Sequence, residues 1–459
     1  MSVIGIDLGS GRVLAVVWAA ENETTTKECS VRLTPTGSTC KVTKWTKEQP
    51  PSTARTTSFD TTETNFKKLL GRMFWDPLAK HEFEYHLLTR EPVELQNGKI
   101  GLRINNQNSE FTPEQITGML FTKILKLIES AIGVRVQNSV ISVPAYFTDA
   151  ERRAVMDAAA FAGLNVLRLM NDTAAVALLY GKETNKDLPG PDDQPRYTFF
   201  VDVGQSTTQI AGVEFNMGKL KVRSTVADPC LGGRDFDLVI AEHFAAEYKG
   251  TCGLDVHSSR EAWLLLLMEC EKLKKHMSDN TSELPLNIEN FMQDKGLRSK
   301  MERSDFEKLS EKLLRRLENL MVRCLKESRL EPGQIHSVEI IGGSTRIPAV
   351  ENLILKVFRR SSSITVDRDA AVAWGCVWMC AMLSSAFNVP NVKVSDVQIY
   401  PIHLRCSAPG SKSEDMELFP YNDAVPSVKN HTFDRSEPFQ LEAFYSSEKT
   451  PIMDKTINV

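Results

Sequence analysis

Short apolar runs, each followed by a glycine-containing turn, predict paired strands near the start of the chain. Residues 3–6 precede Asp7-Leu8-Gly9-Ser10-Gly11, and a second apolar run, residues 14–18, follows at once. An apolar strand, a glycine turn and another apolar strand are typical of a β-hairpin. We therefore predict a hairpin that presents the glycine turn at its tip.

The same order of residues returns in the middle of the chain. Residues 198–201 are apolar, Asp202-Val203-Gly204-Gln205-Ser206-Thr207-Thr208 forms the turn, and residues 210–215 are again apolar-rich. Asp7 and Asp202 stand at the same place in the two patterns. A strand that ends in the same chemistry twice predicts an internal duplication of one large α/β unit.

Apolar residues at helical spacing predict helices between and after the two hairpins. Thr112, Pro113 and Gln115 form a helix start before the apolar positions that continue to Ile128. Thr148 and Glu151 form a capping box for a helix over 152–161, which Gly163 ends. An amphipathic helix is predicted over 261–277, and buried strands are predicted at 138–143 and 338–341.

Two parts of the chain break this regular pattern. Residues 22–65 are polar, threonine-rich and weakly periodic, which indicates a surface loop or a segment that does not pack. Residues 384–391 are typical of a linker, and the alternating segments 392–404 and 439–445 after them suit a β-rich unit. We therefore predict a large domain over 1–383, a linker over 384–391 and a small β-rich unit over 392–459.

Composition narrows the class of protein. The 459 residues carry a formal net charge of −4, with 42% hydrophobic and 25% charged residues, which is ordinary for a soluble globular protein. The mild acidity argues against nucleic acid as a partner. No stretch approaches the ~20 apolar residues of a membrane span, and residues 264–268 are a short apolar patch within a charged helix. Without signal, retention or prenylation motifs, the chain is expected in the cytoplasm or the nucleus.

Cysteine and histidine give no sign of a metal or disulfide framework. The nine cysteines include no CxxC pair, and the eight histidines include no HxxxH or HxH pair. Cys376 and Cys380 have the spacing of two buried neighbours on a helix. A zinc enzyme is therefore not expected.

Four glycine turns together indicate a nucleotide site. Glycines after a strand let the backbone approach a ligand and point N–H groups at it. Two facing hairpins can hold the phosphates of one nucleotide from both sides. A turn at residues 231–237 opens a helix, whose N–H groups and dipole favour anions. The fourth turn, residues 341–348, brings Arg346, which can stack on an adenine ring. No GxxxxGK[ST] is present, so this is not a P-loop protein.

Several motifs resemble the 70-kilodalton heat-shock chaperone superfamily. The duplicated hairpins and Gly342-Gly343-Ser344-Thr345-Arg346-Ile347-Pro348 resemble the actin-like nucleotide-binding fold. The runs at 143–149, 162–168, 171–177, 231–237 and 371–375 resemble the chaperones closely. Residues 149–153, 186–196 and 269–275 resemble its large 110-kilodalton branch. The resemblance implies an α/β, actin-like duplicated ATPase fold with two lobes and four subdomains, followed by a partial β-sandwich.

The resemblance also implies roles for particular residues, with ATP or ADP and Mg²⁺ as cofactors. Asp7 and Asp202 match carboxylates that hold Mg²⁺ through water, and with Asp172 and Thr207 they form the catalytic set. The two phosphate loops match Gly9, Ser10, Gly11 and Arg12, and Gly204, Gln205, Ser206 and Thr207. Ribose and phosphate contacts match Gly233 and Arg234. The nucleoside contacts match Glu271, Lys274, Lys275 and Ser278, whose spacing puts them on one helix face, and also Gly342, Gly343, Ser344, Arg346 and Asp369.

Three departures from the family pattern predict weak catalysis. The family places a lysine beside the transferred phosphate in a motif of the Gly-x-Ala-Ala-Lys kind, and no such motif precedes Leu70-Gly71-Arg72. No lysine can be assigned that role, Lys44 and Lys47 included. The family glutamate that positions water is Asp172, one methylene shorter, and a family aspartate near Mg²⁺ is Gln209. Losing one such group costs roughly 10²–10³ in rate.

The resemblance implies an ATP-binding chaperone or co-chaperone that acts in protein folding and as nucleotide-exchange partner of smaller heat-shock chaperones and their co-chaperones. The segment after residue 392 resembles only the first part of the family's substrate sandwich, without the helical lid, so binding of unfolded clients is not expected of it. The alternatives are a catalytically degenerate nucleotide-binding pseudo-chaperone and a small-molecule kinase of the same fold. At most a weak ATPase is expected.

Overall fold

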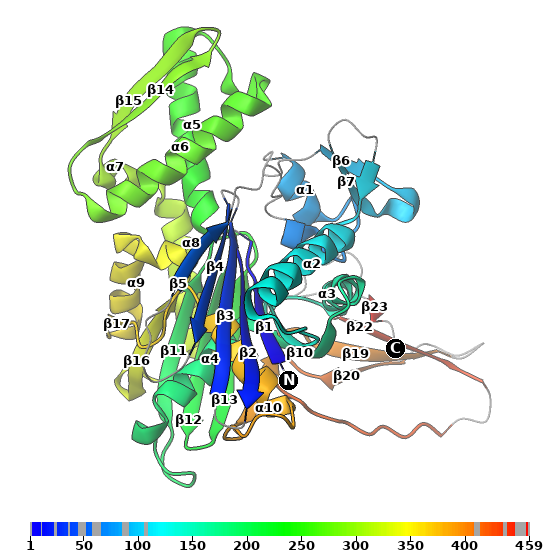
Figure 1. The fold of residues 1–459 in the computed structure, drawn as a ribbon. Helices are drawn as coiled ribbons and strands as arrows, with labels where there is room; N and C mark the ends of the chain where they lie inside the picture. Colours follow the sequence, from blue (N-terminus) through cyan, green and yellow to red (C-terminus); the bar gives the residue numbers. More distant parts are fainter. Residues whose placement is uncertain are drawn as a thin grey trace. The chain divides into compact units, whose positions relative to one another are not determined.

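The described part of the chain forms two seven-stranded sheets (Figure 1). The computed structural model describes residues 2–10, 12–22, 25–34, 37–44, 52–56, 66–84, 91–104, 109–407, 414–434, 438–445 and 456–457. The first sheet has the order β10 (Asn165–Asn171), β9 (Asn138–Val143), β1 (Ser2–Leu8), β2 (Val13–Asn22), β3 (Thr25–Thr34), β4 (Gly37–Lys44) and β5 (Ser52–Thr56). The second has the order β17 (Ser362–Ser363), β16 (Ile335–Ile341), β11 (Arg196–Val203), β12 (Thr208–Asn216), β13 (Lys219–Asp228), β18 (Lys393–Gln398) and β21 (Asp423–Val425).

The predicted duplication is confirmed by the order of the strands. In each sheet, three consecutive strands (β1, β2 and β3, or β11, β12 and β13) lie side by side, and a later strand (β9 or β16) covers the outer edge of the first. The first hairpin closes with Leu8 opposite Val13. Both glycine turns therefore follow the first strand of equivalent ladders.

Residues 22–65 correct the sequence interpretation, because much of this segment is strand and not loop. β3, β4 and β5 extend the first sheet, with Val13 opposite Leu33 on one side of β3 and Lys27 opposite Lys44 on the other. The prediction failed because a backbone ladder needs no alternation of apolar residues, and threonine-rich sequences suit strands. The remaining residues of this segment lie outside the described part of the chain.

Helix ends follow the predicted capping signals. α2 (Pro113–Ile132) begins after Thr112, whose hydroxyl accepts from the Gln115 N–H while the Gln115 side chain accepts from the Thr112 N–H. α3 (Asp149–Phe161) begins after Thr148 with the predicted Glu151 box. The predicted helix over 261–277 is α6 (Arg260–Asp279). The other helices are α1 (Pro77–Glu84), α4 (Asp172–Glu183), α5 (Gly233–Cys252), α7 (Arg303–Leu309), α8 (Glu311–Ser328), α9 (Pro348–Phe358) and α10 (Ala371–Leu383).

The described helices include none that is both long enough and apolar enough to cross a membrane. The smaller sheets are the hairpin of β14 (Leu284–Met292) and β15 (Lys295–Met301), and the three strands β6 (Glu91–Glu94), β7 (Ile100–Ile104) and β8 (Ser109–Phe111). The chain divides into two compact units. Unit 1 comprises residues 1–197, 211–225 and 370–459, and unit 2 comprises residues 198–210 and 226–369.

In unit 1, α10 packs directly on β1 through glycine. A Cβ atom placed on Gly5 would lie 2.2 Å from the Val377 nitrogen, and one on Gly375 would lie 1.9 Å from the Ala175 oxygen of α4. Only a residue without a side chain allows these backbones to approach so closely. Cys376 and Cys380 are fully buried on the same helix. Burial raises the pKa of both thiols, which confirms them as core residues.

The β-rich nature of the chain after residue 392 is confirmed. β18 pairs in parallel with β13, while β19 (Ile402–Ser407) lies between β20 (Glu414–Phe419) and β22 (Gln440–Tyr445), with β23 (Thr456–Ile457) beyond β22. Side chains tie this part to the rest of unit 1. Asp396 of β18 accepts from Asn171 at 2.9 Å, and the Tyr445 hydroxyl accepts from the Asp149 N–H at 3.0 Å.

Candidate functional site

Two acidic side chains and one lysine meet at the end of β1 in unit 1. Asp7 stands near the end of β1, and Asp172 is the first residue of α4. Lys67 lies in a 3₁₀ turn, Phe66–Leu69, with its Nζ 3.9 Å from Asp172 Oδ2 and 6.0 Å from the centroid of the Phe147 ring. Lys67 and Asp172 are both buried. This group, Asp7, Asp172 and Lys67, is the acidic cluster of the site.

Lys67 is a lysine beside Asp172 that the sequence interpretation did not single out. The expected small-residue motif is indeed absent from the sequence, yet the turn before Leu70-Gly71-Arg72 brings a lysine to Asp172 by another route. The neighbouring Lys68 points elsewhere and pairs with the fully buried Glu82 at 3.4 Å. The signal that could have revealed Lys67 is the apolar Phe66 and Leu69 around it, which indicate a packed turn and not a solvated basic run.

Electrostatics in the acidic cluster favour a bound cation. Burial, and next the charge of Asp172, raise the pKa of Asp7 to about 6, while the charges of Lys67 and Arg12 oppose that rise. A carboxylate held in this way gains from any further positive charge placed beside it. Positive charge added beside Asp7 would therefore favour its ionised form.

The first glycine turn follows Asp7 directly. Gly9, Ser10 and Arg12 lie in this turn, and Gly11 lies outside the described residues. A Cβ atom on Gly9 would stand 2.4 Å from the Arg12 oxygen, so the turn closes tightly on itself. In unit 2, Asp202 stands near the end of β11, and the Gly204 N–H donates to the Thr207 oxygen at 2.9 Å. The two turns therefore close between equivalent residues, as the duplication predicts.

Unit 2 gathers the three remaining glycine turns. The Ser344 hydroxyl donates to the Gly204 oxygen at 2.9 Å, and the Gly233 N–H donates to the same oxygen at 2.9 Å. Gly342 adopts φ +81°, and a Cβ there would lie 2.6 Å from Asp202 Oδ1. Gln205, with the fully buried Ser206, fills the turn between. The structure thus brings the predicted residues of unit 2 together.

The start of α5 corrects one detail of the prediction. Its first backbone N–H groups were expected to receive an anion, but Gly233 donates to the Gly204 oxygen and Arg234 to the Gln205 oxygen at 2.8 Å. The Asp235 carboxylate takes the Gly232 N–H at 2.7 Å. Because these N–H groups already bond to protein oxygens and fix the second turn, α5 acts on the site by positioning that turn.

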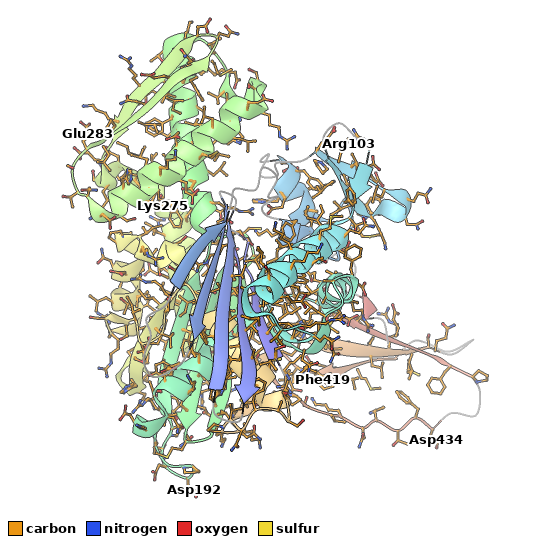
Figure 2. The ribbon with its side chains drawn as sticks, viewed as in Figure 1. Arg103, Asp192, Lys275, Glu283, Phe419 and Asp434 are labelled. Carbon is orange, nitrogen blue, oxygen red and sulfur yellow. The ribbon has the colours of Figure 1, made fainter. Side chains whose placement is uncertain are left out.

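α6 presents the predicted nucleoside contacts in two different environments. Lys274 is buried, donates to the Gly233 oxygen at 2.6 Å and pairs with Asp237 at 2.7 Å. Glu271 and Lys275 form an exposed pair at 2.7 Å, and the Ser278 hydroxyl donates to the Lys274 oxygen at 3.1 Å. Lys275 is labelled in Figure 2. Asp237 was missed as a site residue, although it stands in the quoted 231–237 motif.

Asp369 fixes the orientation of the planar guanidinium group of Arg346. Its guanidinium reaches both carboxylate oxygens of Asp369, at 3.3 and 2.8 Å, and 45% of its side chain stays exposed. A two-point contact of this kind fixes the plane of the guanidinium. Gly343 leaves room beside it, since a Cβ there would lie 3.7 Å from Arg346 Nη1.

One buried aspartate, Asp237, and two half-buried ones, Asp7 and Asp396, make stability depend on pH in a defined direction. Burial raises the pKa of Asp7, Asp237 and Asp396 to about 6, above the ~3.9 of an unfolded aspartate. Between these values the folded state holds more protons than the unfolded chain. The free energy of unfolding contributed by these groups therefore falls as pH rises from about 4 to about 6.

Between pH 4 and pH 7, we expect the free energy of unfolding of Asp396→Asn to rise by roughly 2–3 kcal/mol relative to that of the parent chain. The size of this change follows because one pKa unit corresponds to about 1.4 kcal/mol. Urea denaturation without nucleotide measures the difference. Asp255→Asn is the control, because Asp255 is exposed and a hydrogen bond from Lys249 lowers its pKa. A difference between Asp396→Asn and the parent that does not change with pH would contradict the assignment.

Comparisons with known proteins agree along the whole chain. The family model described as Hsp70 protein matches residues 3–457. The 97 kDa heat shock protein of Mesocentrotus franciscanus is 40% identical over 460 residues, covering 100% of this chain and 52% of that protein. Heat shock 70 kDa protein 4 of Rattus norvegicus and of Homo sapiens are each 44% identical over 467 residues, covering 100% of this chain and 55% of each relative.

The chain spans about half the length of the curated relatives that it matches. The matched region nevertheless covers the whole of this chain. The resemblance predicted from the sequence, including that to the large branch, is confirmed, and so is the actin-like ATPase fold. The chain therefore belongs to the Hsp70 family.

Proposed function

We propose that this chain binds ATP with Mg²⁺ and serves the chaperone cycle as a nucleotide-exchange partner of smaller heat-shock chaperones, in the cytoplasm or nucleus. The observation that carries the proposal is the acidic cluster of Asp7, Asp172 and Lys67 in a chain that matches the Hsp70 family over residues 3–457. That family consists of nucleotide-binding ATPases that use ATP or ADP and Mg²⁺. Unit 2, by itself, carries glycine turns whose residues match further nucleotide contacts of the family.

The residues present fit a nucleotide with a hydrated metal ion. Asp7 is a half-buried carboxylate whose ionised form a nearby positive charge would favour. Among the described residues, no group of three or more His, Cys, Asp or Glu could hold a metal ion directly. Asp7 would hold Mg²⁺ through water, as its match to the family implies, and the ion would supply charge neutralisation at the phosphates.

The chain's own groups would position the phosphates and an attacking water. Lys67 brings a fixed positive charge beside Asp172, and Asp172 can accept a hydrogen bond from water. Ser10, Thr207 and Ser344 offer hydroxyls at the glycine turns. Lys274, held by Asp237, fixes α6 so that Glu271, Lys275 and Ser278 face the nucleoside.

We infer that hydrolysis is slow but not absent. With Lys67 in place, one of the three expected losses disappears, and support for a catalytically degenerate protein weakens with it. Two losses stay: Asp172 is shorter than a glutamate, and the buried Gln209 carries no charge. A small-molecule kinase gains no support, since the family match includes the β-rich segment that such kinases lack.

The test is release of labelled ADP from a purified 70-kilodalton chaperone. We expect this chain, preloaded with ATP, to accelerate the release, and the same chain freed of nucleotide to accelerate it less, because nucleotide would order the residues that it contacts. Asp7→Asn should behave like the nucleotide-free chain. A rate of ADP release unchanged by any of these additions would refute the exchange role and leave ATP binding to be judged by calorimetry.

A further inference from the structure

One face of α6 carries an exposed stripe that the nucleotide site does not use. Glu261, Leu265, Met268 and Lys272 are all exposed, with 37% of Leu265, 53% of Met268 and 59% of the Lys272 side chain accessible. Their spacing of four, three and four residues places them along one line of the helix. These four residues are the α6 stripe. None of them belongs to the predicted nucleotide contacts.

The centre of the α6 stripe is more apolar than is usual for a helix face that contacts water. Residues 264–268 are all apolar, yet Leu266 alone among them is fully buried, and Leu264 and Leu267 stay partly accessible beside the stripe. Single exposed apolar residues are ordinary on protein surfaces, but contiguous groups mark interaction sites. α6 packs on α5 and β14, which lie beside it in Figure 1.

We propose that the α6 stripe is a self-association surface, on which α6 of a second copy of this chain packs in antiparallel orientation. With Leu265 opposite Met268 of the second copy, the same register puts Glu261 opposite Lys272 of the second copy. Two-fold symmetry repeats both contacts. The apolar pairs then lie at the centre of the contact and the opposite charges lie at its two ends.

Charge excludes the parallel arrangement. In a parallel pair, Glu261 would meet Glu261 and Lys272 would meet Lys272, and like charges across an interface are costly. The present partners of these charges are replaceable. Ser259 donates to Glu261 at 3.1 Å, and Lys272 pairs with Glu269 at 2.6 Å on the same exposed helix face. Exposed contacts of this kind stabilise little.

The contact is expected to be weak and dependent on concentration. A single pair of helices buries less than the ~1,600 Å² of a standard interface. The association should therefore appear as a monomer–dimer equilibrium and not as a permanent dimer. It requires nothing of the nucleotide, so it stands or falls apart from the proposed function.

Sedimentation equilibrium of the full chain at several concentrations tests the proposal. Leu265→Asp should raise the dissociation constant roughly tenfold or more, because the variant would bury an unpaired charge at the centre of the contact. Glu261→Lys and Lys272→Glu should each raise it roughly threefold to tenfold, since each single change opposes two like charges. The double variant Glu261→Lys with Lys272→Glu should return it close to that of the parent.

The control is Val322→Asp on α8, where an apolar side chain of comparable exposure, 49%, lies away from the stripe. It should leave the dissociation constant unchanged. Circular dichroism of each variant reports whether the overall helix content of the chain is kept. A parent chain that stays monomeric at every concentration would overturn the proposal, and so would dimers that Leu265→Asp does not weaken. Failure of the double variant to recover would overturn the antiparallel register.

Discussion

Replacing Gly342 by alanine is expected to lower the free energy of unfolding by roughly 2–4 kcal/mol and to abolish measurable ATP binding. Gly342 adopts φ +81°, a conformation that L side chains rarely take. The new Cβ would lie 2.4 Å from the Val203 oxygen and 2.6 Å from Asp202 Oδ1. Both atoms belong to the strand that ends at the second turn, so relief of the clash must displace Asp202 and Gly204 together.

Urea denaturation and calorimetry with Mg²⁺ and ATP measure the two effects of Gly342→Ala. Gly250→Ala is the matched control in unit 2, because no atom lies within 4 Å of its added Cβ and the residue stands within α5. That change should stabilise the protein by up to about 1 kcal/mol, the ordinary gain of alanine over glycine in a helix. Unaltered ATP affinity in Gly342→Ala would show that this turn takes no part in binding.

Lys67→Met should reduce single-turnover ATP hydrolysis by roughly 10²–10³, the usual cost of one electrostatic group at a reacting centre. The ratio of ATP affinity to ADP affinity should also fall, because the lost charge would act on the outermost phosphate. Methionine keeps the length and apolar contacts of the side chain near Phe147. The pKa of Asp7 should rise further, since Lys67 opposes its present rise.

Lys68→Met separates this effect from simple damage to the turn. Lys68 lies next in the same 3₁₀ turn but pairs with the buried Glu82. Its loss removes a positive charge beside the buried Glu82 carboxylate, which His81 Nδ1 also approaches at 3.7 Å, and should cost stability, with little change in turnover per folded molecule. If Lys68→Met slowed hydrolysis as much as Lys67→Met, the role would belong to the turn as a whole and not to the Lys67 ammonium.

Features with local causes could be predicted from the sequence. The start of α2 depends on Thr112 and Gln115, three residues apart, and both hydrogen bonds of that box form as expected. A glycine turn between two apolar runs likewise predicts each of the two hairpins. Equivalent turns in equivalent strands then made the duplication visible without any knowledge of the contacts between distant segments.

Features that depend on distant segments could not be predicted. Lys67 and Asp172 meet only because a 3₁₀ turn and the first residue of α4 come together in the fold, and no motif marks the lysine. The N–H groups of Gly233 and Arg234 could bind an anion in isolation, but carbonyls of the second turn take them. The strands β3 to β5 were not predicted, because their hydrogen-bond ladder is formed by backbone groups that every residue carries.

The pairing of β18 with β13 bears on where this chain can be cut. Shortening it after residue 383, where the sequence suggests a boundary, would remove the neighbour of β13 on one side, along Lys219–Lys221, and expose an unpaired strand edge to other chains. It would also remove Asp396 and Tyr445, which hold Asn171 and Asp149. Such a fragment is expected to aggregate, whereas one that keeps β18 and β22 retains its cover. A domain boundary predicted from composition therefore need not be a place where the chain can be divided.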